Sequence, residues 1–172
     1  MSIVNLCKGT ELPLNSLERR VGEMMGEERQ REAERKGYCN QTQPIRDLLA
    51  NNVGAAQAEL AIARALNLFP SVTRSIADPD LILHGGETVD VKWNLNYRDL
   101  LVDDLKIDKP CDYYLVVLGP VESFTFGGWA TRAEVFRRDR LIRLPTRRDA
   151  CYVVRSRDLR NAFIPALAVV RP

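Results

Sequence analysis

Apolar residues recur at helical spacing near the start of the chain. The positions that define this stripe are Leu14, Leu17, Val21 and Met24. Intervals of three or four residues place such side chains on one face of an α-helix. Asn15 and Glu18 are spaced as a capping box at its beginning, and Gly37 follows a charge-rich continuation as a natural end. We therefore expect a first helix from about residue 14 to residue 36.

Two further helical segments are expected before residue 70. Pro44 can begin a short helix that continues to about Ala50, where Asn51-Asn52 interrupts the pattern. A segment rich in alanine and leucine then predicts a second helix over 53–67, followed by Pro70.

The rest of the chain carries short segments that are typical of β-strands. The expected strands are 81–84, 88–93, 113–118, 123–126 and 151–155. Gly85-Gly86 is suited to the turn of a hairpin between the first two. Segment 113–118 is continuously apolar, as in a strand buried on both faces. A short helix over 131–138 and a further turn or two over 159–163 complete the prediction.

This order of elements predicts an α/β fold with a mixed central β-sheet flanked by α-helices. The 172 residues fit a single domain, and no apolar run approaches the ~20 residues of a membrane span. The four cysteines have no paired spacing: Cys7, Cys39, Cys111 and Cys151. A zinc site or a disulfide framework therefore has little support, and we expect a cytoplasmic protein with reduced thiols.

Positive charge is concentrated in the segment 132–160. It holds ten arginines, four acidic residues and no lysine, which gives a net charge of +6. The arginines are Arg132, Arg137, Arg138, Arg140, Arg143, Arg147, Arg148, Arg155, Arg157 and Arg160. Guanidinium groups bind phosphate oxygens well, so the segment suggests a polyanionic partner. The alternative is a solvated, arginine-rich face.

The expected strand 88–93 combines a polar and an apolar face. Successive side chains of a strand point to opposite sides, so Asp90 and Lys92 share one face. Val89, Val91 and Trp93 share the other. Pro79-Asp80 precedes this strand across the expected hairpin, so a second carboxylate is placed close to Asp90.

Glu59 supplies a third carboxylate, within the small, apolar stripe of the expected helix 53–67. Burial of an unpaired carboxylate is costly, so Glu59 needs a cation or hydrogen bonds. One interpretation is that Glu59 only edges the stripe and pairs with an arginine such as Arg64. The other is a site of three converging carboxylates, whose hard oxygens suit Mg²⁺ or Mn²⁺ rather than zinc.

In the second interpretation, Asp80, Asp90 and the main-chain carbonyl of Val91 hold the metal, with Glu59 bound through water or orienting the nucleophile. Lys92 would hold the attacking water and offset negative charge in the transition state, its own charge maintained by the nearby carboxylates. The competing reading is that these are ordinary surface carboxylates.

Together, Glu59, Pro79-Asp80 and Asp90-Val91-Lys92 resemble the PD-(D/E)xK, or restriction-endonuclease-like, nuclease superfamily. The resemblance covers about residues 53–155, which would form the catalytic core behind a helical N-terminal extension, residues 1–52. It implies metal ligation by Asp80, Asp90 and the Val91 carbonyl, and a catalytic role for Lys92 and Glu59. Asp90 stands where many members have glutamate.

A second likeness concerns Phe124-Thr125-Phe126-Gly127-Gly128-Trp129-Ala130 followed by Glu134. It is similar to a segment of small phage and prokaryotic members of the superfamily, which suggests a viral protein acting in the host cytoplasm.

The expected function is thus a Mg²⁺- or Mn²⁺-dependent deoxyribonuclease, an endonuclease acting on double-stranded DNA. Cleavage of both strands would favour a homodimer with two sites. Alternatives are a Holliday-junction-resolvase-like enzyme, a nicking enzyme, an exonuclease, and a catalytically silent nucleic-acid-binding module with the same fold. His84, on the strand after Asp80, is a weaker candidate base. Asp103, Asp104, Asp108 and Asp112 are expected in an exposed acidic loop.

Overall fold

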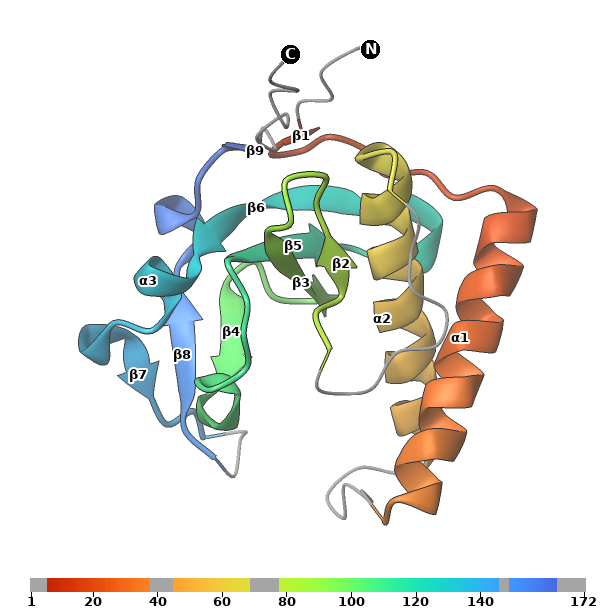
Figure 1. The fold of residues 1–172 in the computed structure, drawn as a ribbon, viewed down its shortest axis with the longest axis horizontal. Coiled ribbons are helices and arrows are strands. Elements are labelled where there is room, and N and C mark those ends of the chain that lie inside the picture. The colour runs from red at the N-terminus through yellow and green to blue at the C-terminus, as the bar shows by residue number, and fades with distance from the viewer. Residues whose placement is uncertain (1–5, 38–44, 69–77, 146–148, 164–172) are drawn as a thin grey trace.

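The computed structural model describes residues 6–37, 45–68, 78–145 and 149–163. Cys39, Pro44, Pro70, Arg147 and Arg148, which entered the predictions above, lie outside these ranges. Two long helices precede the strands of the central sheet: α1 (Ser16–Arg35) and α2 (Ile45–Ala65). They lie side by side, with α2 against the central sheet and α1 on the outer side of α2 (Figure 1).

The central sheet contains four strands in the order β2-β3-β5-β6. Their bounds are Leu81–Ile82, Thr88–Asn94, Tyr113–Leu118 and Thr125–Thr131. The central pair β3 and β5 is parallel, whereas β2 and β6 each join antiparallel. The predicted α/β class with a mixed sheet is therefore confirmed.

The two faces of the sheet are covered differently. Helix α2 packs on one face, where Ile62 meets Val89, Val91 and Leu115 in the larger apolar cluster. A second sheet in the order β4-β8-β7 lies on the other face (Figure 1). Its strands are Leu100–Asp103, Cys151–Val154 and Leu141–Ile142. The long helices thus flank the sheet on one face, whereas buried strands and the one-turn helix α3 (Arg132–Val135) cover the second.

The two helices expected over 44–50 and 53–67 form one continuous helix, α2. Asn51-Asn52 does not interrupt it: the side chain of Asn52 donates a hydrogen bond to the Gln30 side chain of α1 at 2.7 Å. The boundary expected at residue 52 consequently falls inside α2, and α1 packs along the same helix.

Helix α1 confirms the first predicted helix, including the capping box of Asn15 and Glu18. Its close approach to α2 depends on glycine. A Cβ on Gly26 would lie 2.5 Å from the Cα of Val53, and one on Gly22 would lie 2.3 Å from a side-chain carbon of Gln57. Because these two positions have no side chains, the backbones of α1 and α2 can approach closely. This close approach determines where the rest of α1 lies relative to α2.

Four other expectations need correction. Strand β6 continues through Gly127 and Gly128 to Thr131, because a register shift opposite Val116/Val117 and a positive φ at Gly128 accommodate the glycines. The helix expected over 131–138 is only α3, capped by Thr131. Segment 159–163 ends in strand β9 (Ala162–Phe163), paired with β1 (Leu6–Cys7).

The fourth correction concerns the expected acidic loop. Leu100–Asp103 is strand β4, because Leu100 and Val102 alternate inward against β8. Of the described cysteines, Cys7 and Cys111 are free thiols. Neither long helix, over the residues described, has the length and apolar character required to cross a bilayer.

Candidate functional site

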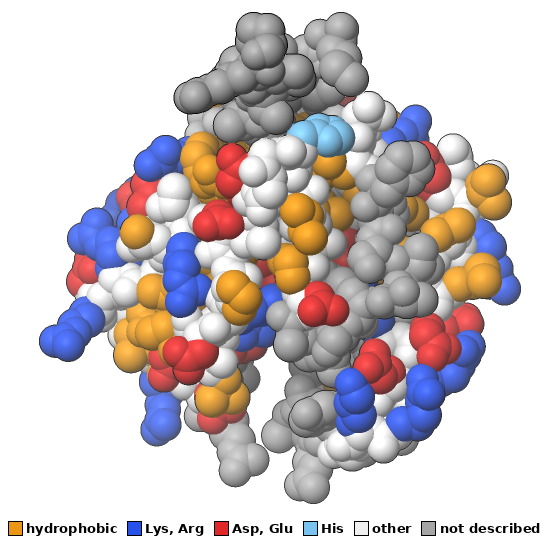
Figure 2. Space-filling model, in the orientation of Figure 1, with side chains coloured by type: hydrophobic (Ala, Val, Ile, Leu, Met, Phe, Trp, Pro, Cys, Tyr) orange, Lys and Arg blue, Asp and Glu red, His pale blue; other side chains and the backbone are white. Residues whose placement is uncertain are grey.

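A cavity of about 510 Å³ opens next to the start of β2, where β3 continues beyond its pairing with β2. Five predicted site residues line it: Glu59, Asp80, Asp90, Val91 and Lys92. They come from α2, from the residue before β2, and from β3. The structure therefore gathers in one cavity the residues that the sequence singled out. His84, by contrast, lies exposed on the hairpin and is not among the lining residues (Figure 2).

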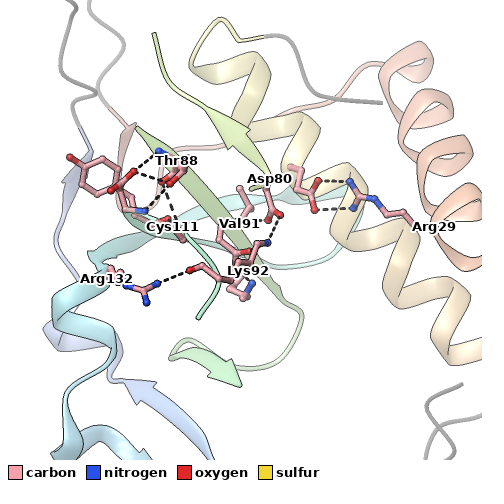
Figure 3. A network of polar contacts seen from close by, with 12 residues as sticks. Arg29, Asp80, Thr88, Val91, Lys92, Cys111 and Arg132 are labelled. Atoms are coloured by element: carbon pink, nitrogen blue, oxygen red, sulfur yellow. Dashed lines mark hydrogen bonds and ion pairs between the residues drawn. The ribbon is translucent and has the colours of Figure 1, made fainter. Parts of the chain in front are cut away.

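Asp80 extends the pairing of β2 with β3 by one backbone and one side-chain hydrogen bond. Its backbone N–H donates to the Val89 carbonyl at 2.9 Å, and its Oδ2 accepts the N–H of Val91 at 2.6 Å (Figure 3). In an antiparallel ladder the N–H and C=O of one residue point to the same neighbour. The Val91 carbonyl therefore points to the side of β3 on which Asp80 lies.

Strand β3 presents Asp90 and Lys92 on one face, as predicted. Asp90 is 1% exposed, and its carboxylate is paired with the Lys92 ammonium. Their partners in the parallel ladder are Tyr114 and Val116, which belong to the smaller apolar cluster, while Val89 and Val91 face the larger one. Burial from both sides thus fixes the direction in which the carboxylate and the ammonium point.

A second lysine connects the two aspartates. The Nζ of Lys109 lies 2.9 Å from Oδ1 of Asp90 and 3.7 Å from Oδ1 of Asp80. Lys109 follows the short 3₁₀ helix η1 (Asp104–Lys106), and Lys106 lines the same cavity. The aspartates therefore converge on one positive charge, which the protein itself supplies.

Glu59 is held by α1. Its buried carboxylate accepts two hydrogen bonds from Arg29, at 2.9 Å from Nη1 and 2.6 Å from Nη2 (Figure 3). The interpretation that Glu59 pairs with an arginine is confirmed, but the partner is Arg29, since Arg64 donates to the Pro13 carbonyl and to Glu18. The helix outside the predicted core thus contributes directly to the cavity.

Replacement of Arg29 by methionine is expected to lower the free energy of unfolding by about 3 kcal/mol, because the buried Glu59 carboxylate loses its bidentate partner. Urea unfolding measures this. The matched control is Arg31→Met on the same helix, whose ion pairs are at the surface and should contribute less than about 1 kcal/mol. Equal losses for the two variants would contradict a structural role for the Arg29–Glu59 pair.

The environment of Lys92 favours the charged ammonium less than the sequence suggests. Burial lowers the pKa of Lys92 to about 7, and the positive charges of Lys106 and Lys109 act in the same direction, while Asp80 opposes them. The prediction that neighbouring carboxylates keep this group fully charged did not allow for two further lysines in the cavity.

The donor set fits a hard cation in part. Asp80, Asp90 and the Val91 carbonyl present oxygen only, which is the chemistry that Mg²⁺ and Mn²⁺ prefer. Among the residues described, no three His, Cys, Asp or Glu side chains form a group able to hold a metal ion. The expected cluster of three carboxylates is thus reduced to two, because Arg29 engages both oxygens of Glu59.

The arginines of segment 132–160 do not all face solvent as phosphate ligands. Arg132 donates to the carbonyls of Ile107 and Lys109, Arg140 to that of Glu134, and Arg160 binds the Glu134 carboxylate. On the face drawn in Figure 2, basic and acidic side chains are intermixed. Several of these guanidinium groups therefore hold the fold together rather than form a uniform basic patch.

Three basic residues of the cavity had no predicted role in the site: Arg29, Lys106 and Lys109. Arg29 belongs to a charge-balanced helix and resembles its solvated neighbours in sequence. The two lysines lie in a segment that looks acidic and irregular, where no periodicity shows which side chains turn inward. The one available signal is that the chain has only five lysines and three of them fall in 92–109.

Comparison of the sequence with models of known protein families and with curated proteins gave no match.

Proposed function

We propose that the protein is a divalent-cation-dependent DNA endonuclease with a restriction-endonuclease-like core. The observation that carries this proposal is the convergence of Asp80 and Asp90 on one positive charge, the ammonium of Lys109. Lys92 lies beside Asp90 on the same face of β3. Two buried carboxylates and an ammonium in one cavity form a combination suited to phosphodiester hydrolysis.

In this proposal Asp80, Asp90 and the Val91 carbonyl hold Mg²⁺ or Mn²⁺. When bound, such a cation polarises the scissile phosphate and lowers the pKa of a coordinated water. Lys92 positions the attacking water and offsets negative charge on the phosphate oxygens as the transition state forms. Asp80 is kept in place by the Val91 N–H, and Glu59 by Arg29, so neither carboxylate has to be reorganised when substrate arrives.

DNA is the proposed partner because basic side chains line the cavity beside its acidic ones and are also found in a second groove. Arg29, Lys92, Lys106 and Lys109 line the cavity itself. A separate groove of about 470 Å³ is lined by Arg137, Arg140 and Arg155 together with Asp139 and Asp158. Such contacts supply affinity for the phosphate backbone that decreases with salt and has little sequence preference. Cleavage of both strands would require a second site, for example in a homodimer.

The proposal is tested with supercoiled plasmid. We expect conversion to nicked or linear DNA in Mg²⁺ or Mn²⁺, and no conversion in excess EDTA. A preparation that binds DNA but leaves the plasmid supercoiled in both metals would overturn the nuclease proposal.

One observation favours a second candidate, a catalytically silent nucleic-acid-binding module. Asp90 is paired with two lysines and Glu59 with an arginine, so these carboxylates are already neutralised by protein groups. If the protein is such a module, we expect a gel-shift series to show DNA binding that weakens with salt, and we expect no cleavage of the DNA.

A further inference from the structure

Lys109 contacts both predicted metal-binding aspartates, yet neither the sequence pattern nor the proposed mechanism assigns it a role. Its ammonium lies 2.9 Å from Asp90 and 3.7 Å from Asp80, on the Oδ1 atom of each. The Lys109 side chain is only 12% exposed. It therefore occupies the position between the two carboxylates that a hard cation would take.

The surrounding structure holds Lys109 in this position. Arg132, on α3, donates a hydrogen bond to the Lys109 carbonyl at 2.6 Å and another to the carbonyl of Ile107. The N–H of Lys109 donates to the Lys106 carbonyl at 3.1 Å. The backbone at the lysine and just before it is thus held by hydrogen bonds, and the side chain reaches the aspartates from this turn.

The aspartates need a positive charge in this environment. Asp80 is 6% exposed and Asp90 1% exposed, and two neighbouring carboxylates with so little water repel each other strongly. Lys92 is paired with Asp90, whereas Lys109 is within ion-pair distance of both. Lys109 is therefore the lysine whose charge offsets the repulsion between the two.

We propose that Lys109 is a built-in counter-ion that occupies the divalent-cation position until the metal binds and is displaced by it. The inference rests on the proposed function. It makes Lys109 a positioning residue: it keeps Asp80 and Asp90 together in the metal-free protein, and it competes with the metal for their Oδ1 atoms. Once displaced, the ammonium stays in the cavity with Lys92 and Lys106, where a phosphate group would enter.

The test is isothermal titration of Mn²⁺ into the wild type, Lys109→Met and Lys106→Met. Lys106 lines the same cavity and, within the described part of the chain, makes no ion pair, so its variant reports the general effect of removing one positive charge. We expect Lys109→Met to bind Mn²⁺ at least about tenfold more tightly than the wild type, because the competing cation is gone. Lys106→Met should change the affinity by less than about threefold.

Equal Mn²⁺ affinity in the wild type and Lys109→Met, weaker binding in Lys109→Met, or equal gains in the two variants would overturn the inference while leaving the proposed function intact. Absence of Mn²⁺ binding in all three proteins would overturn both. Lys109→Gln provides a second variant. If either variant is unfolded in EDTA, circular dichroism during Mn²⁺ addition replaces the titration: refolding supports the counter-ion role, and failure to refold at any Mn²⁺ concentration overturns it.

Discussion

Substitution of Lys92 by methionine is expected to lower the rate of plasmid cleavage by about three orders of magnitude. The side chain lies on β3 beside Asp90, in the cavity that would receive the scissile phosphate. Removal of a single preorganised group that stabilises transition-state charge costs about 10²–10³ in rate, and Lys92 is also proposed to position the water. Single-turnover cleavage of supercoiled plasmid in Mg²⁺ measures the effect.

Lys36→Met is the control for this substitution, because it removes the same charge from an exposed lysine at the C-terminal end of α1 that does not line the cavity. Its cleavage rate should remain within about tenfold of the wild type. Near-ultraviolet circular dichroism establishes that the variants are folded. A folded Lys92→Met protein that cleaves at the wild-type rate would exclude Lys92 from the chemistry.

Replacement of Asp90 by asparagine is expected to weaken Mn²⁺ binding by at least about 100-fold and to abolish detectable cleavage. Hard divalent cations depend on ionised carboxylates, and an amide provides one neutral oxygen instead. The same change leaves Lys92 and Lys109 without their shared anion, so a loss of stability of about 3 kcal/mol is expected as well. Titration calorimetry with Mn²⁺ and urea unfolding separate the two effects.

Asp108→Asn is the control for Asp90→Asn. Asp108 is exposed, lies next to Lys109 in sequence, and is not among the residues that line the cavity. Its removal changes the net charge by the same amount and should leave Mn²⁺ affinity and cleavage nearly unchanged. Wild-type affinity in a folded Asp90→Asn protein would mean that any metal binds elsewhere.

The sequence was sufficient where one local pattern determines the outcome. Alternation over 88–93 predicted both β3 and the faces of Asp90 and Val91. The capping box predicted the start of α1, and Gly85-Gly86 the hairpin between β2 and β3. These features depend on neighbouring residues alone, so periodicity and turn chemistry reveal them.

Elements that depend on distant partners were predicted less well. β4 is four residues long and becomes a strand only because β8, some fifty residues later, pairs with it. α2 continues through Asn51-Asn52 because α1 packs along it. In both cases tertiary contacts override weak local preferences.

The candidate site also combines features that neighbouring residues determine with features that depend on distant partners. The positions of Asp80, Asp90 and Lys92 follow from a hairpin and one strand, which lie close together in sequence. The counter-ions do not: Arg29 reaches Glu59 across thirty residues, and Lys109 reaches Asp90 across nineteen, from a turn without periodicity. Charge neutralisation of the buried carboxylates could be expected from the sequence, but the partners could not be identified.

The central claim is that Asp80 and Asp90 hold a common divalent cation, and anomalous diffraction from crystals soaked in Mn²⁺ tests it most directly. The account predicts one strong peak within about 2.5 Å of an oxygen atom from each aspartate, with the Lys109 ammonium moved away from it. The absence of a peak between the two carboxylates, at a Mn²⁺ concentration that supports plasmid cleavage, would contradict it.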